Sequence, residues 1–343
     1  YVYNPIVSDG KVYFFDLKKN IYCLNEDTGK LVWLVSLRKI SSQFSAFSRA
    51  FGKIKYPLIK GNYIFLTDNI AVYCLNKNNG RVLWARTGRR HDRSMDNIRR
   101  WKFGESRRWK SRFRFRSRYY NPRRSSRALV DSIYANPVIY DNYIYYGTRN
   151  VFVSRDIFNG HLKWKNSSIK SFSGFPSFYD KYLLTQSMNY STLRFTLYCL
   201  VARTGQVKWQ KRLPRPFKIY SPVVYKKKIY LALTKSLYCM HLKTGKTIWK
   251  KQFSNYITSN PSFTEREILF VVGNRRVVIV DPKTGKKKRE IDLGFKSSPY
   301  FVTIRDHIYI AHNFKKTVGG RKITFTTIKG LLLKDGGRMW QFK

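Results

Sequence analysis

The sequence predicts an all-β fold in which a unit of four short strands repeats along the chain. The first observation is a glycine four residues before a tryptophan, as in LYCMHLKTGKTIW, which ends at Trp249. The same spacing recurs at Trp33, Trp84, Trp164, Trp209 and Trp340. A seventh copy, VVIVDPKTGKKKR, keeps Gly285 but carries Arg289 at the tryptophan position. One copy would mean little, but seven indicate a repeat.

The second observation is a short apolar segment with a proline ahead of each glycine turn. These segments are NPIV, YPLI, NPVI, FPSF, SPVV, NPSF and SPYF. The seven proline segments alternate with the seven glycine turns. An internal repeat of roughly 40 residues is typical of a propeller or a solenoid.

The third observation is the pattern inside one unit, residues 220–252. YSPVVY, IYLAL, SLYCM and KTIWKKQF are short apolar or alternating runs separated by tight turns. Proline lacks an N–H group and suits a strand start. Four short strands per repeat are typical of a propeller blade, so the chain predicts a β-propeller of about seven four-stranded blades, with eight as the alternative. We expect a single domain, 1–343, with an insertion at 88–127 between the second and third blades.

Each repeat places its tryptophan on the fourth strand, where the ring can pack between one blade and the next. The glycine supplies the positive φ angle of the preceding hairpin. We therefore expect six tryptophans to join blades as structural staples rather than to bind a ligand: Trp33, Trp84, Trp164, Trp209, Trp249 and Trp340.

The four cysteines occupy one repeat position, YC(L/M), in different blades: Cys23, Cys74, Cys199 and Cys239. A disulfide needs Cα atoms within about 7 Å, so equivalent positions in neighbouring blades should be too far apart. We expect small buried hydrophobic residues with free thiols. Free thiols favour a reducing compartment, or an envelope without strong oxidising machinery.

The run (Y/V)xLxxxTGxxxW with an upstream SPVV-like strand resembles the PQQ-like propeller repeat. That repeat occurs in quinoprotein dehydrogenases and in BamB-type outer-membrane assembly factors, and the resemblance covers nearly the whole chain except 88–127. The dehydrogenases hold their cofactor with calcium-ligating acids, a catalytic aspartate and an adjacent Cys-Cys disulfide. This sequence has no Cys-Cys pair and few acids, and Asp281 and Asp335 stand in repeat turns. We expect no enzyme, no catalytic residue, no metal, no cofactor and no small-molecule substrate.

The charge is strongly positive, with 68 lysines and arginines against 19 acidic residues, a net charge of +49. Such a surface repels itself unless an anion covers it. Nucleic acid, acidic lipid or glycan headgroups and acidic protein are the candidates, and a basic bias of the whole proteome is the alternative.

The largest insertion, 88–127, combines fourteen arginines and two lysines with aromatic residues and three acids. Arginine makes bidentate phosphate contacts, and aromatic rings stack on unpaired bases, although the mixture also suits an anionic lipid surface. The anion-binding candidates are Arg99, Arg100, Arg107, Arg108, Arg112, Arg114, Arg116, Arg118, Arg123 and Arg124. The stacking candidates are Trp101, Trp109, Phe113, Phe115, Tyr119 and Tyr120. A solvated, disordered loop is the alternative.

Three further extensions are predicted: residues between Trp33 and Pro57, QSMNYSTLRF in the fourth blade and NFKKTVGGRK in the seventh. Connections from the second to the third strand, and from the fourth strand to the next blade, leave an antiparallel blade on one face. All four extensions fall on that face, which we expect to bind partners.

Two functions remain open. The leading hypothesis, implied by the resemblance, is a non-enzymatic BamB-like scaffold that holds proteins in a larger assembly, in the periplasm at the outer membrane of a bacterial envelope and against an anionic surface. The alternative, from charge and the arginine–aromatic insertion, is an RNA-binding structural subunit of a ribosome or other ribonucleoprotein, in an organelle or the cytoplasm.

Overall fold

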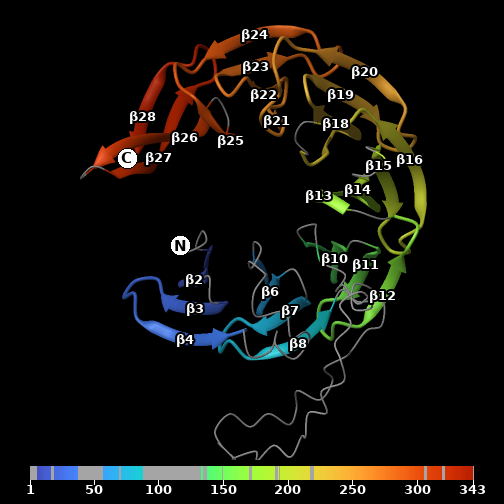
Figure 1. Ribbon diagram of the computed structural model, residues 1–343, viewed down its shortest axis with the longest axis vertical. Helices are drawn as coiled ribbons and strands as arrows, with labels where there is room; N and C mark the ends of the chain where they lie inside the picture. The colour runs from blue at the N-terminus through green and yellow to red at the C-terminus, as the bar shows by residue number, and fades with distance from the viewer. Residues whose placement is uncertain are drawn as a thin grey trace, which may run out of the picture. The chain divides into compact units, whose positions relative to one another are not determined.

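The computed structural model describes residues 6–16, 19–37, 57–68, 71–87, 133, 137–148, 150–169, 172–189, 192, 194–216, 220–304, 307–318 and 321–342. These residues form seven four-stranded antiparallel sheets (Figure 1). The prediction of an all-β propeller with four-stranded blades is confirmed. The chain divides into two compact units, 1–171 with three sheets and 172–343 with four. That the whole chain is one domain, and that an eighth blade exists, stay predictions.

In the first unit, the strands of each sheet pair in chain order. The first sheet contains β1 (Ile6–Ser8), β2 (Lys11–Phe15), β3 (Asn20–Asn25) and β4 (Leu31–Ser36). The second contains β5 (Leu58–Lys60), β6 (Tyr63–Thr67), β7 (Ala71–Asn76) and β8 (Val82–Thr87). The third contains β9 (Val138–Tyr140), β10 (Tyr143–Gly147), β11 (Phe152–Asp156) and β12 (Leu162–Asn166).

The second unit repeats this order in four sheets. The fourth sheet contains β13 (Phe172–Tyr179), β14 (Tyr182–Asn189), β15 (Arg194–Val201) and β16 (Val207–Leu213). The fifth contains β17 (Val223–Tyr225), β18 (Lys228–Leu233), β19 (Ser236–His241) and β20 (Thr247–Gln252). The sixth contains β21 (Ser262–Phe263), β22 (Ile268–Val272), β23 (Arg276–Val280) and β24 (Lys287–Asp292). The seventh contains β25 (Ser297–Ile304), β26 (His307–Val318), β27 (Arg321–Leu332) and β28 (Arg338–Phe342).

The core lies between consecutive sheets within each unit. Strands in the middle of a sheet are covered on both faces, so they are apolar without alternation, as in KIYLAL of β18. The fourth strand is partly exposed and alternates, as in VKWQKRL of β16. One core cluster joins the fourth and fifth sheets, with Leu197 and Cys199 from one sheet and Leu231 and Met240 from the other.

The last hairpin of each repeat has a fixed hydrogen-bond pattern. In the fifth sheet Gly245 has a φ of +69° and its N–H donates to His241 O at 2.8 Å. In the sixth sheet the carboxylate of Asp281 accepts from the N–H groups of Lys283 and Thr284, at 2.9 and 2.8 Å. Asp281 therefore acts in a turn, as the sequence indicates.

Two of the predicted extended connections are continuations of strands. β14 and β15 stay paired as far as Asn189 and Arg194. β26 and β27 stay paired as far as Val318 and Arg321, so these two strands are the longest in the described residues. Tyrosine, threonine, phenylalanine and valine in these segments favour strands, which explains why the ladders continue. The connection after Trp33 lies largely outside the described residues, which resume at Pro57.

Candidate functional site

The tryptophan of one sheet contacts the glycine turn of the next sheet at four places. Each indole Nε1 donates to the carbonyl three residues before that glycine. The bonds run from Trp33 to Lys77 at 3.1 Å, from Trp84 to Ile157 at 2.9 Å, from Trp209 to Leu242 at 2.9 Å and from Trp249 to Pro282 at 3.3 Å. Each bond crosses from one sheet to the next inside one unit, so the fourth strand is positioned by its neighbour.

The indole rings also lie against the glycines themselves. A Cβ atom added at Gly245 would lie 2.7 Å from Trp209 Cε3, and one at Gly160 would lie 2.7 Å from Trp84 Cδ2. Trp164 packs against Tyr145 and Phe152 of its own sheet, at ring distances of 5.9 and 6.1 Å. The side chain of Trp340 lies outside the described side chains. That these contacts stabilise the fold remains a prediction.

Arg289 takes the tryptophan position in the sixth sheet. Its Nη1 and Nη2 donate to Glu267 Oε1 and Oε2 at 2.7 and 3.0 Å. Nη2 also donates to Leu333 O at 3.5 Å, and Leu333 stands three residues before Gly336. Ile291 faces Gly336 where an indole faces the other glycines. A guanidinium and an isoleucine thus replace the indole, which the sequence alone did not reveal.

The cysteines lie opposite the tryptophans in the sheets. The register pairs Cys23 with Trp33, Cys74 with Trp84, Cys199 with Trp209 and Cys239 with Trp249. All four are buried and free, so the prediction of buried, unpaired thiols is confirmed. Burial raises the pKa of Cys199 to about 12, although the Lys208 charge lowers it slightly. These thiols stay protonated and are poor nucleophiles.

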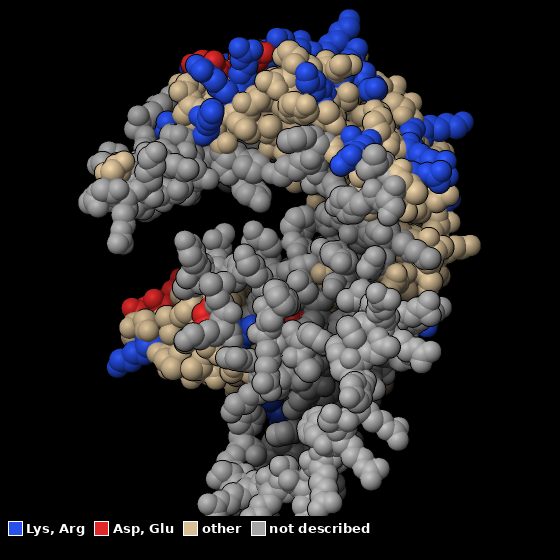
Figure 2. Space-filling model, viewed as in Figure 1, with Lys and Arg blue, Asp and Glu red and all other residues tan. Residues whose placement is uncertain are grey.

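The arginines and aromatic residues predicted to bind an anion or stack on bases lie in 88–127, outside the described residues. The structure instead brings together a basic surface that the sequence reasoning missed. In the second unit β16, β20 and β24 lie on the outside, while β13 and β21 lie on the inside (Figure 1). Figure 2 shows lysine and arginine side chains gathered along this outer edge. Exposed lysines on edge strands also prevent pairing between sheets of different molecules.

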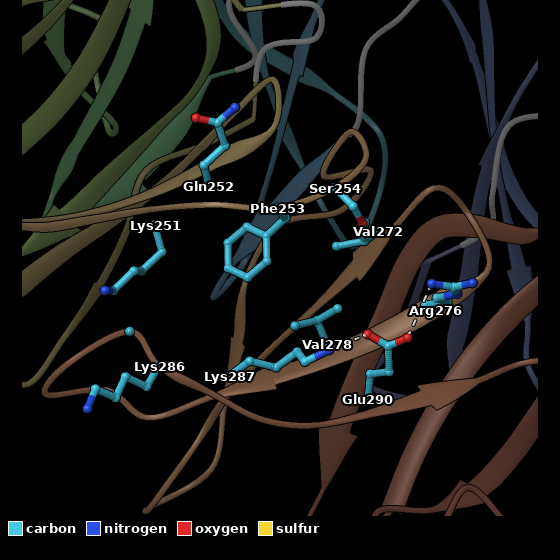
Figure 3. A pocket seen from close by; sticks show the side chains of 11 residues that line it. Lys251, Gln252, Phe253, Ser254, Val272, Arg276, Val278, Lys286, Lys287 and Glu290 are labelled. Carbon is cyan, nitrogen blue, oxygen red and sulfur yellow. Dashed lines mark hydrogen bonds and ion pairs between the residues drawn. The ribbon is translucent and has the colours of Figure 1, made fainter.

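A cavity of about 580 Å³ lies between β20 and the sixth sheet (Figure 3). Its apolar wall contains Phe253, Val272 and Val278. The ring of Phe253 packs edge-on against Phe270, with centroids 4.9 Å apart. The polar lining residues are Lys251, Gln252, Ser254, Arg276, Lys286, Lys287 and Glu290.

Four cations and one carboxylate line this cavity. Glu290 pairs with Lys287 at 3.0 Å and with Arg276 at 3.3 Å, as the dashed lines in Figure 3 show. The side-chain ammonium groups of Lys251 and Lys286 have no hydrogen-bond or ion-pair partner within the described part of the chain. The cavity therefore carries an excess of positive charge beside an apolar wall, which suits an anionic ligand with an apolar group.

The described residues hold no group of three or more His, Cys, Asp or Glu side chains placed to bind a metal ion. Asp335, like Asp281, is used in a turn, where it accepts from Gly337 N at 2.7 Å. No helix in the described ranges is long and apolar enough to cross a membrane.

Solved structures with a similar fold include BamB from Moraxella catarrhalis, which is 15% identical, with a TM-score of 0.58 over 88% of this chain and 76% of that one. The computationally designed Ika8 protein is 11% identical, with a TM-score of 0.62 over 98% and 85% of the two chains. A europium-containing methanol dehydrogenase is 11% identical, with a TM-score of 0.60 over 99% and 77%. Because BamB and a dehydrogenase both share the fold, the fold alone assigns no reaction.

The search of curated proteins gave no match to this chain. A family model described as outer membrane protein assembly factor BamB matches residues 3–100, 112–211 and 194–294. The resemblance that the repeat indicates is thereby confirmed. Since this model covers most of the chain in three successive stretches, the chain belongs to the family of outer membrane protein assembly factor BamB.

Proposed function

We propose that this protein is a non-enzymatic scaffold that binds partner proteins in a larger assembly, at the outer membrane of a bacterial envelope and next to an anionic surface. The observation that carries the proposal is the match to the BamB family model over residues 3–100, 112–211 and 194–294. The proposal includes no small-molecule substrate and no cofactor.

The packing of the sheets supports a scaffold role. Both faces of the middle strands are buried, and the indole bonds tie the fourth strand of one sheet to the turn of the next. Rigid elements of this kind hold their exposed edges and turns in fixed positions, which lowers the entropic cost of binding a partner. The exposed outer strands and turns are therefore surfaces that we assign to partner proteins, in addition to the face that carries the four extensions.

The charge supports the anionic part of the proposal. The net charge of +49 is distributed between the insertion and the rest of the chain, and cations gather along the outer strands of the second unit. Lysine-rich surfaces attract acidic headgroups, glycans or acidic proteins over a distance of about 10 Å at moderate salt.

An RNA-binding subunit of a ribosome or other ribonucleoprotein is the second candidate. Two features of the sequence favour it: the net charge, and the alternation of Arg112, Arg114, Arg116 and Arg118 with Phe113 and Phe115. This combination supplies both phosphate contacts and stacking surfaces. In that case the protein would lie in an organelle or the cytoplasm.

Gentle isolation of the protein from its native cells at low salt, with and without nuclease, separates the two candidates. Recovery together with outer-membrane proteins, unchanged by nuclease, is the outcome expected for the scaffold. Stoichiometric RNA whose digestion releases the protein from its partners would contradict the scaffold and support the ribonucleoprotein subunit.

A further inference from the structure

We propose that the cavity between β20 and β24 binds an acidic peptide segment of a partner protein. An apolar side chain of that segment packs on Phe253, and its carboxylates lie beside the ammonium groups of Lys251 and Lys286. The inference rests on the proposed scaffold function and names the partner's chemistry at one site.

A comparison with the preceding pair of sheets shows how the charge excess arises. Lys211 stands two residues after Trp209, just as Lys251 stands two residues after Trp249. Lys211 Nζ donates to Gly245 O at 3.0 Å and to Thr247 Oγ1 at 2.8 Å, so its charge is bound across the sheet boundary.

At the next boundary the hydroxyl is replaced by a cation. Thr247 stands two residues after Gly245, and Lys287 takes the corresponding place two residues after Gly285. Lys251 packs its Cγ beside Gly285 but has no hydroxyl acceptor there, and the ammonium of Lys287 is paired with Glu290 at 3.0 Å. Lys286 adds another ammonium without a partner in the described chain. A ligand carboxylate would supply the missing acceptor.

The apolar wall selects a peptide among the anions. Val272 and Val278 are buried, whereas Phe253 is half-buried and presents apolar surface to the cavity. An apolar anchor surrounded by polar contacts is the usual arrangement of the energetically important centre of a protein interface. The volume also falls in the range of about 300–1,000 Å³ found for ligand sites.

The position of the cavity also suits an extended segment. β20 and β24 are the last strands of their sheets, so each has one edge without a paired strand in the sheet. Exposed residues of both strands lie beside the cavity, so an extended segment can reach it from the outer edge of the sheets.

Fluorescence anisotropy on the full chain at low salt tests the proposal. The probe is a fluorescein-labelled peptide, Glu-Asp-Glu-Phe-Glu-Asp-Glu, and a second peptide carries serine in place of phenylalanine. The double variant Lys251→Glu/Lys286→Glu should bind the first peptide at least about tenfold more weakly. Lys251→Gln/Lys286→Gln, which removes charge without adding a carboxylate, should show a smaller loss.

The matched control is Lys243→Glu/Lys246→Glu, which makes the same charge change at exposed residues of the neighbouring turn that do not line the cavity. It should keep most of the affinity, and thermal unfolding should show all variants folded. Equal loss in the two Glu double variants would overturn the proposal, because general charge attraction would then explain binding. Equal binding of the serine peptide would overturn the role of the apolar wall.

A labelled short oligouridylate is the competing probe. If it binds more tightly than the peptide and loses affinity through the same two substitutions, the cavity is a nucleic-acid site and the peptide proposal is wrong. Failure of the peptide to bind would also reject this cavity as an acidic-peptide site. The scaffold function would survive that result, because co-purification of outer-membrane proteins tests it independently.

Discussion

Glycine is required for two reasons at the turn that joins the third and fourth strands of a sheet. At Gly245 the backbone has a φ of +69°, which side chains with a Cβ rarely adopt. The neighbouring indole of Trp209 leaves no room for a Cβ atom. The sequence predicted the first reason from the hairpin position. The second reason, the lack of room for a Cβ atom, depends on which residue of the neighbouring sheet lies beside the glycine. The repeat spacing alone does not establish that residue.

The substitution Gly245→Ala should separate these two effects when compared with Gly294→Ala. Gly294 has a φ of +67° but nothing within 4 Å of an added Cβ. Alanine there should therefore lower the free energy of unfolding only through backbone strain, by about 1 kcal/mol. Alanine at Gly245 adds a collision with Trp209, for a total of about 3 kcal/mol. Urea unfolding of both variants measures the difference. Equal losses would show that the indole moves aside freely.

Arg289 shows how one repeat tolerates the loss of its tryptophan. Its bidentate pair with Glu267 is partly buried, with 12% of the Glu267 side chain exposed, whereas the Lys287–Glu290 pair on the same strand is more open. Shielding and two parallel bonds make the first pair the stronger one.

A double-mutant cycle with Glu267→Ala and Arg289→Ala should therefore give a coupling energy of about 1–2 kcal/mol. The matched cycle with Lys287→Ala and Glu290→Ala should give less than about 0.5 kcal/mol. Thermal or urea unfolding of the single and double variants supplies both values. Similar coupling in the two cycles would contradict a structural role for the Arg289 pair.

At the scale of the strand, the two-residue alternation and the turn residues were sufficient to predict four-stranded sheets. The lengths of β26 and β27 were not predictable in the same way, because NFKKTVGGRK reads equally well as a polar loop. Pairing between the two strands settles the choice, since each segment satisfies the backbone groups of the other. The third strand was predicted more fully, including its buried cysteine with a free thiol, whereas the pairing of that cysteine with the tryptophan was not predicted.

Burial of that cysteine makes a prediction about pH. The pKa of the Cys199 thiol rises from its ordinary value of 9.0 to about 12 in the folded protein. The unfolded chain therefore loses this proton first, and the thiol's contribution to stability, complete below pH 9, decreases as pH rises from 9 toward 12. Urea midpoints at about pH 8 and pH 10.5 measure the change.

The comparison that isolates this effect is with Cys199→Ala. Deprotonation of lysines weakens the self-repulsion of both proteins at high pH, so only the difference between them reports on the thiol. The wild-type protein should lose more stability, or gain less, than the variant over this interval. Identical pH dependence would show that the thiol is not protected in the folded state.

At the scale of the whole molecule, the sequence predicted the fold more completely than the binding sites. The cavity at β20 and β24 was missed because Lys251 and Lys287 are distant in sequence and ordinary in type. The two residues come together because the glycine–tryptophan contact joins their sheets. An alignment of the repeats could have found the cavity, because Lys251 and Lys287 occupy the positions of Lys211 and Thr247, which are hydrogen-bonded to each other. The insertion 88–127 was found from composition alone, and its role stays a prediction.

The insertion carries a charge of +13 out of the total of +49, so its contribution to anion binding can be measured apart from that of the sheets. Replacing 88–127 with a short Gly-Ser linker should weaken binding to single-stranded RNA and flatten the plot of log affinity against log salt. Each phosphate contact that is lost should reduce the slope by about 0.7, because fewer counterions are released.

The control is a variant with lysine at Arg112, Arg114, Arg116 and Arg118, which keeps the charge but removes the planar guanidinium groups. It should retain the slope while losing affinity, since the slope counts charges and the bidentate contacts add strength. An unchanged slope in the linker variant would contradict a role of the insertion in binding RNA. The outer strands of the second unit would then be the part of the protein that contacts the anionic surface.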